Sequence, residues 1–216
     1  MDLRLQHIAP LLFFLLLALA CRERKGSRPN EPVQSVFTAA EDVTAAVQAL
    51  LPAPHNQQVK EAGKWYDATG ENWLVLYQTG PYMAANGTQS SDITAVLYGK
   101  TDSGFRETWR LRETVTGCRQ TASAVFMDGH LQIADSDSNA VAEVFIVYTY
   151  GCGEQGMRHK KMVCYEGGSV TTLRGSADAM FADPGNAPET DAAFLQREPR
   201  VQTAIQQHWD RLTVRK

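Results

Sequence analysis

Between residues 58 and 173 the chain alternates apolar and polar side chains with a period of two, and turn residues interrupt it about every 8–12 residues. Gly70 and Gly80-Pro81 bound one apolar segment, and Asp128-Gly129 separates two others as a strong hairpin signal. The predicted strands include residues 73–77, 93–98, 105–111, 122–127, 130–133, 141–150, 160–165 and 169–173. This spacing predicts a mainly β domain: an antiparallel sandwich, open barrel or meander of about eight to nine strands.

The segment 141–150 differs from the other predicted strands because both of its faces are apolar. A strand with two apolar faces is covered on both sides, so we expect it near the centre of its sheet. A second, weaker pattern repeats around it. Asp67-Ala-Thr-Gly-Glu71 leads from an acidic turn into an apolar strand, as residues 135–147 do.

Two helices are predicted to flank the strands, one on each side. Thr38-Ala-Ala-Glu41 matches a capping box, and the apolar residues on one helical face after it are Val43, Ala46, Val47 and Leu50. We expect this helix to pack on the domain edge, and binding of a partner is the alternative. The second helix begins near Pro199, and its apolar stripe contains Val201, Ile205, His208 and Leu212, with Trp209 alongside. Residues 35–216 are expected to form a single β-rich domain with these flanking helices.

The first residues predict the location of the protein. Residues 1–20 contain an apolar stretch that is short for a membrane span, which indicates a signal peptide. The ending Leu17-Ala-Leu-Ala-Cys21 resembles the lipobox of bacterial lipoproteins, which implies lipidation of Cys21, and an ordinary signal peptide is the alternative. The polar residues 21–34 predict a disordered tether. The resemblance implies a lipid anchor in the bacterial cell envelope, and Arg22 implies the outer membrane, on its periplasmic or surface face.

The cysteines predict one disulfide. With Cys21 lipidated, three thiols remain in an oxidising compartment, which allows one bridge and one free cysteine. Cys118 follows Gly117 and Cys152 lies between two glycines, so both are in turns, and we expect Cys118–Cys152 to form. Cys164 lies in an alternating strand and is expected to be a small buried apolar residue. No Cys or His pair has the ligand spacing of a zinc site.

Asp135-Ser-Asp137-Ser-Asn139 is the strongest candidate for a cation site. Calcium takes oxygen ligands from alternate positions of a flexible acidic loop. In that order Asp135, Asp137 and Asn139 supply side-chain oxygens, Val141 supplies its carbonyl and Glu143 closes the set. The stretch resembles the short calcium loops of FG-GAP-type β proteins, which also precede a strand.

Two features of the acidic stretch bear on this interpretation. The sixth position, usually glycine because the backbone turns sharply there, is Ala140, and a left-handed conformation costs such a residue about 1–2 kcal/mol. The alternative is a solvated acidic turn whose Asp and Asn side chains bond their own backbone.

The sequence predicts no catalytic residue. It contains no Gly-x-Ser-x-Gly elbow, no His-Glu-x-x-His and no phosphate loop, and its histidines are scattered. The net charge of −3 argues against a nucleic acid as a partner.

Arg106, Arg110 and Arg112 are separated by even numbers and are predicted to share one strand face. That face would be an anion site or a solvated surface. The aromatic residues near the first hairpin are core or sugar-stacking candidates: Trp65, Tyr66, Trp73, Tyr77 and Tyr82.

Several short segments together resemble a family of bacterial lipoproteins labelled surface-polysaccharide biosynthesis proteins. They are residues 65–72 with the strand after them and Thr79-Gly80, residues 135–144 with their strand, Cys152, and Leu173-Arg-Gly175. The resemblance covers about residues 60–176 and implies a role in making or displaying surface polysaccharide. It implies no catalytic residues.

These observations favour a non-enzymatic binding or accessory module anchored in the envelope, with an envelope glycan or another envelope protein as its partner and calcium as a candidate cofactor. One alternative is a hydrolase or transferase acting on envelope glycans, which requires two carboxylates about 5–10 Å apart in a cleft. Another is an inhibitor lipoprotein that inserts its 81–90 loop into a target enzyme.

Overall fold

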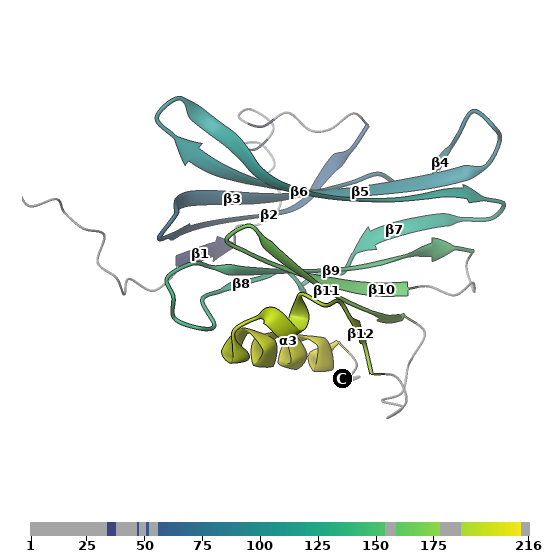
Figure 1. The fold of residues 1–216 in the computed structure, drawn as a ribbon. Coiled ribbons are helices and arrows are strands. Elements are labelled where there is room, and N and C mark those ends of the chain that lie inside the picture. Colours follow the sequence, from purple (N-terminus) through teal and green to yellow (C-terminus); the bar gives the residue numbers. More distant parts are fainter. Residues whose placement is uncertain are drawn as a thin grey trace, which may run out of the picture. The chain divides into compact units, whose positions relative to one another are not determined.

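Two antiparallel sheets face each other in the computed structural model of the protein (Figure 1). The structure describes residues 47, 51, 56–153, 159–177 and 187–212, together with the backbone of 34–37. The predicted signal peptide, Cys21 and nearly all of the predicted tether therefore lie outside the described residues. So does most of the predicted N-terminal helix.

The first sheet holds the earlier part of the chain and the second sheet the later part. The first contains β1 (Gln34–Phe37), β2 (Gln58–Asp67), β3 (Gly70–Gln78), β4 (Tyr82–Met83), β5 (Gln89–Thr101) and β6 (Gly104–Cys118). The second contains β7 (Ala122–Phe126), β8 (Gln132–Ala134), β9 (Glu143–Cys152), β10 (His159–Glu166), β11 (Ser169–Ser176) and β12 (Glu189–Thr190). The predicted mainly β class with antiparallel sheets is confirmed.

Strand β9 is central in the second sheet, as its composition predicts. It pairs with β10 on one edge and with β7 and β8 on the other. Val144, Ile146 and Tyr148 belong to the core between the two sheets, whereas Phe145 and Val147 belong to a second apolar cluster on the opposite face. The strand therefore needs apolar side chains on both faces.

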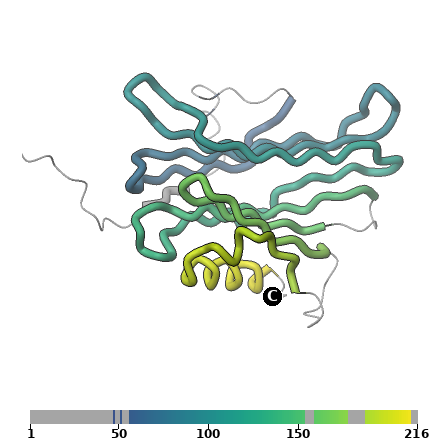
Figure 2. The backbone as a smooth tube through the Cα atoms, in the orientation of Figure 1, coloured from purple at the N-terminus to yellow at the C-terminus, as the bar shows by residue number. Residues whose placement is uncertain are grey.

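Helix α3 (Pro199–Arg211) forms the second cluster by covering the second sheet, and the backbone trace shows it in yellow beneath the green strands (Figure 2). Val201, Ile205 and Trp209 are buried against the sheet. Glu198 caps the helix by accepting the N–H of Arg200 at 2.7 Å, and Pro199 occupies the first helical position. The predicted C-terminal helix is thus confirmed with its apolar stripe.

The outer face of the first sheet buries a third apolar cluster. Val75, Tyr77 and Val96 pack there with Val47 and Leu51, the two described residues from the region of the predicted N-terminal helix. Val47 is fully buried, which agrees with its expected place on an apolar face. The remainder of that helix lies outside the described residues.

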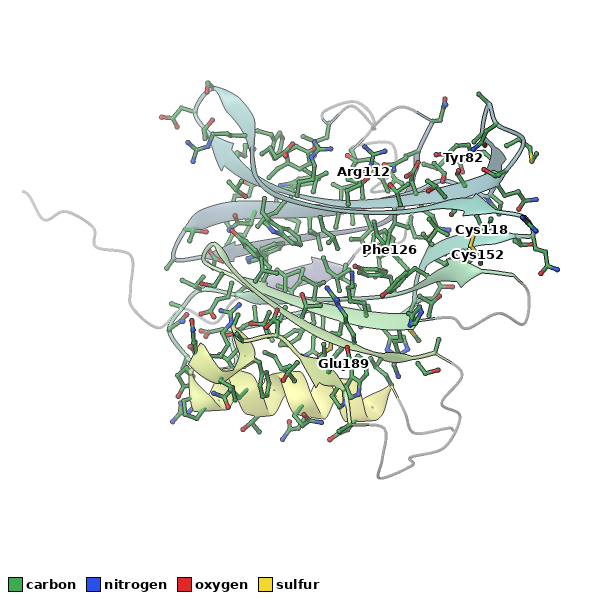
Figure 3. All side chains as sticks on the ribbon, turned by 45° about the vertical axis from the view of Figure 1, so that its right-hand side comes forward. Tyr82, Arg112, Cys118, Phe126, Cys152 and Glu189 are labelled. Carbon is green, nitrogen blue, oxygen red and sulfur yellow. A yellow bond between two sulfur atoms is a disulfide. The ribbon has the colours of Figure 1, made fainter. Side chains whose placement is uncertain are left out.

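The two sheets are tied together along β7. Backbone N–H groups of β7 would be unpaired at the sheet edge, but Ala122 donates to Gln89 Oε1 at 3.2 Å and Ala124 donates to Ser91 Oγ at 3.1 Å. The disulfide Cys118–Cys152 then links β6 to β9, as predicted (Figure 3). Cys164 is free and buried, which also agrees with the sequence analysis.

The contact of Gly175 with Trp209 allows the packing of α3 against the second sheet to be tested. A Cβ on Gly175 would lie 2.9 Å from Cζ2 of the buried Trp209 ring, so Gly175→Ala should lower the free energy of unfolding by about 1–3 kcal/mol. Gly80→Ala is the matched control, because nothing lies within 4 Å of its added Cβ. Chemical denaturation compares the two variants, and equal stability would contradict the packing argument.

His208 generates a second test, because it is buried on α3 and stacked on Phe145 with ring centroids 5.3 Å apart. Burial, with Arg211 adding to it, lowers the pKa of His208 to about 4, while the unfolded pKa is about 6.5. The unfolded state therefore binds more protons between these values, and stability falls as pH drops through this window. We expect about 2–3 kcal/mol of stability to be lost between pH 7 and pH 4.5 through this group.

The His208 contribution is measured by denaturant unfolding of the wild type and of His208→Gln at both pH values. The variant should lose less stability on acidification than the wild type, by about the amount given above. His159→Gln, at an exposed position, should behave as the wild type does. An identical pH dependence of wild type and His208→Gln would show that His208 ionises normally.

Candidate metal centre

The acidic stretch 135–142 connects β8 to β9 and closes a hairpin between them. Ala134 and Glu143 are the last paired residues of the two strands, so the loop starts and ends at one point. The carboxylates of Asp135, Asp137 and Glu143 each place an oxygen within 4.8 Å of the others. Three of the five predicted cation ligands are thereby brought together.

Glu143 is the buried member of this acidic trio. Its side chain is 0% exposed because it opens the central strand beneath the loop. One oxygen, Oε2, accepts the backbone N–H of Ser136 at 2.6 Å, whereas Oε1 is buried and has no hydrogen-bond partner within the part of the chain that the structure describes. Burial raises the pKa of Glu143 to about 7. A buried oxygen without a donor is costly, and a cation would satisfy it.

Asp135 and Asp137 organise the loop around themselves. Asp135 accepts the backbone N–H of Asn139 at 3.1 Å and that of Ala140 at 3.0 Å, and Asp137 accepts the N–H of Asn139 at 3.0 Å. Both carboxylates are half-exposed, in contrast to Glu143. The loop therefore has the backbone hydrogen bonds expected of an acidic turn. It also brings the three carboxylates together, so the two interpretations of the loop are compatible.

Ala140 adopts the left-handed conformation that its position in the loop requires, with φ at 66°. Its N–H donates to Asp135, and its carbonyl accepts the N–H of Ala68 at 2.7 Å. These two hydrogen bonds offset the cost of about 1–2 kcal/mol that the Cβ imposes. The absence of glycine at this position does not prevent the sharp turn.

The other two predicted ligands are less directly placed. Asn139 Oδ1 accepts the N–H of Val141 at 2.7 Å, and its amide nitrogen donates to Glu166 Oε1 at 2.6 Å. The amide oxygen therefore faces the backbone of its own loop. Asn139 and the Val141 carbonyl stay predicted ligands.

Asp67, the last residue of β2 in the first sheet, contacts the site and was not predicted to do so from the sequence. Its Oδ2 accepts the indole N–H of Trp65 at 2.8 Å and the backbone N–H of Ala142 at 3.2 Å. Its Oδ1 accepts from Thr69 and Asn72. The two acidic turns that resemble each other in sequence thus lie side by side, and that repeat was the only available signal.

On its other side the acidic loop is linked to the segment that leads into α3. Glu166, which accepts from Asn139, also forms an ion pair with Arg197 at 2.9 Å, and both side chains are largely buried. Arg197 further donates to the carbonyl of Ser169 at 2.9 Å. The loop is thus held between the first sheet and the start of α3.

An open hollow of about 420 Å³ adjoins the loop, between α3 and β8. Ser136 of the loop, Gln132 of β8, and Arg200 and Arg211 of α3 contribute to its lining. Arg200 donates to the backbone carbonyl of Asp137 at 3.4 Å, which joins the hollow to the acidic trio.

The prediction that Arg106, Arg110 and Arg112 share one strand face is wrong for Arg106. The register between β5 and β6 shifts so that Thr108 is an extra residue in β6. One extra residue reverses the faces of the residues before it, so Arg106 lies on the side opposite Arg110 and Arg112. The latter two each form an ion pair with a neighbouring carboxylate.

The aromatic residues predicted to be core or sugar-stacking residues differ in their exposure to solvent. Trp65 and Tyr77 are buried, Trp73 is half-buried, and Tyr66 and Tyr82 are exposed. Tyr82 lies in the β4–β5 hairpin that forms the 81–90 segment, where Figure 3 labels it at one end of the first sheet.

Comparisons of the chain with protein-family models, with curated proteins and with solved structures each found no match. The described part of the chain contains no helix that is long and apolar enough to cross a membrane.

The position of Asp67 generates a test of the link between the two acidic turns. Asp67→Ala removes the acceptor of the buried Trp65 indole and of the Ala142 N–H, and should lower the free energy of unfolding by about 2–3 kcal/mol. Asp102→Ala, in the exposed β5–β6 turn, should change it by no more than about 0.5 kcal/mol. Urea unfolding measures both variants, and similar stabilities would show that Asp67 does not connect the turns energetically.

Proposed function

We propose that the protein is a non-enzymatic binding module of the bacterial cell envelope, tethered through Cys21, whose β8–β9 loop holds a calcium ion. The observation that carries the calcium site is the buried, unpartnered Oε1 of Glu143 beside two half-exposed carboxylates. Oxygen ligands on a loop are what calcium prefers, and its flexible coordination tolerates backbone carbonyls and water among them.

The loop is supported as a binding site by the hydrogen bonds that hold its shape without an ion. Asp135 and Asp137 are oriented by the loop's own N–H groups, and Ala140 is held by Ala68 of the neighbouring turn. A cation entering such a loop would order few additional groups, so little of its binding energy would be spent on folding the site.

The non-enzymatic interpretation is supported by the way the three acids are arranged. Glu143 lies beneath the loop, away from solvent, while the other two carboxylates accept hydrogen bonds from the backbone. A glycan hydrolase needs two carboxylates facing a bound substrate across a cleft. A trio converging on one point, with its deepest member inaccessible, suits an ion better than a scissile bond.

The envelope location rests on the lipobox-like ending at Cys21, and a role in displaying or binding surface polysaccharide rests on the resemblance of residues 60–176 to that lipoprotein family. The envelope location and the polysaccharide role are parts of the proposal, as is the calcium ion. A lipid-anchored domain on a tether would keep the calcium loop close to envelope glycans or proteins, with the ion adding a charged contact.

Thermal unfolding of the purified protein with calcium and with a chelator tests the proposal. Binding to the folded state alone, at 100 times the dissociation constant, should add about 2.7 kcal/mol and raise the melting temperature by roughly 5–10 °C. Magnesium at equal concentration should raise it less, because it demands stricter geometry and gives up its water reluctantly.

Two variants separate a cation site from a structural turn. Asp135→Ala should abolish the calcium response. Glu143→Gln should also abolish it, yet should leave the calcium-free protein as stable as the wild type or more so, because the buried charge is gone while the side-chain shape remains. Asp102→Ala is the control that should keep the full response. A melting temperature that calcium leaves unchanged would refute the site.

A further inference from the structure

Among the residues that the structure describes, those that line the hollow beside the β8–β9 loop include no acidic side chain. One face of α3 supplies Arg200, Thr203, Gln207 and Arg211, and Gln132 and Ser136 supply the opposite wall. The α3 residues recur at intervals that place them on one side of the helix. The hollow is about 420 Å³, within the size range of pockets for small molecules, and Ala204 is the one apolar residue among its described lining residues. Its chemistry therefore suits a polar and negatively charged ligand.

The two arginines are already oriented by the protein. Arg211 donates to Gln132 Oε1 at 3.0 Å, and the same oxygen lies 2.8 Å from Nδ1 of His208. Arg200 donates to the Asp137 carbonyl at 3.4 Å. A guanidinium carries five N–H donors, so these contacts leave donors free to bind a carboxylate or phosphate in the forked geometry that such anions prefer.

The same contacts bring the hollow against the metal centre. Arg200 reaches the backbone of Asp137, and Ser136 lies between Asp135 and Asp137 and donates its N–H to Glu143. Without a cation, the three carboxylates would repel an anion in the hollow. A calcium ion at the trio would offset that charge and would add a second positive group beside the arginines.

We infer that this hollow binds a small hydroxylated anion, a sugar acid or sugar phosphate, next to the calcium ion. The inference rests on the proposed function and names its ligand class. Arg200, beside the metal centre, binds the carboxylate or phosphate, while Arg211 and the hydroxyl and amide groups of Ser136, Thr203 and Gln207 bind the hydroxyls of the ligand. Calcium and the anion favour each other's binding, and the coupling is reciprocal.

Calorimetric titration of the purified full-length protein tests this inference with three probes: glucuronate, glucose 6-phosphate and uncharged glucose. Each is added in calcium-containing buffer and in buffer freed of divalent ions. At least one of the two anionic sugars should bind with an affinity that calcium raises about tenfold, while glucose should show no measurable binding. The two anionic arms distinguish a carboxylate ligand from a phosphate ligand.

Arg200→Gln should weaken binding of the anionic sugar about tenfold, since it removes a charge-assisted contact. Arg119→Gln, an exposed arginine in the β6–β7 turn, is the matched control and should bind as the wild type does. The inference is overturned if anionic sugars bind no better than glucose, if calcium does not change their affinity, or if the two arginine variants bind alike.

Measuring the melting temperature of Arg200→Gln with and without calcium distinguishes the proposed calcium site from the proposed anion site. Arg200 is not a ligand of the ion, so this variant should keep the calcium response that Asp135→Ala loses. A retained response with no anion binding in the wild type refutes the hollow and leaves the calcium site intact. A missing response in the wild type refutes the calcium site itself, and the ion-assisted binding with it.

Discussion

The burial of β9 on both faces is the constraint on which the rest of the second sheet depends. Its side chains face the first sheet on one side and α3 on the other, so the strand has no solvent-exposed face over Val144–Tyr148. Glu143 begins this strand and is buried with it. A carboxylate placed there by the packing needs compensation, and among the described residues the backbone N–H of Ser136 reaches one of its two oxygens while the other has no partner. The acidic loop therefore meets a buried carboxylate at the point where the central strand starts.

The two ends of the sandwich are closed by different chemistry. At one end the disulfide Cys118–Cys152 and the polar side chains along β7 join the sheets. At the other, Asp67 accepts donors from both sheets, because Trp65 belongs to β2 and Ala142 directly precedes β9. Covalent and hydrogen-bonded links thus perform the same task at opposite ends. The hydrogen-bonded end is the one that carries the candidate oxygen ligands, so the link and the candidate site share one framework.

Local patterns were sufficient to predict most of the longer strands, the disulfide and the C-terminal helix, because alternation, glycine-rich turns and helical stripes involve neighbouring residues. The hairpin predicted at Asp128-Gly129 is wrong, because β7 and β8 both pair with β9 and not with each other. The short strands β1, β4 and β12 were missed, since pairing with a distant strand defines them rather than their own composition. The extra residue at Thr108 likewise has no sequence signature, and it moved Arg106 to the other face.

The candidate site shows the same division between local and distant information. Spacing alone placed Asp135, Asp137 and Glu143 together, because the loop is a continuous stretch closed by the β8–β9 pairing. Asp67 and Arg200 could not be assigned to it from spacing, because they lie 68 and 65 residues from Asp135 in the chain (135 − 67 and 200 − 135). Only the packing of the sheets and of α3 brings them to the loop.

The charge arrangement around the loop is the basis for proposing an ion and an anion in one site. The three carboxylates converge at one point, while Arg200 of α3 donates to the Asp137 carbonyl and lines the hollow together with Arg211. Among the described contacts Arg200 donates to the Asp137 backbone carbonyl and forms no ion pair with the three carboxylates. The carboxylates and the guanidinium are therefore both available to ligands. In the proposed site a cation would complete the acidic side, and that change in local charge would let the basic side attract an anion. The loop would then act as the element through which each ligand alters the affinity for the other.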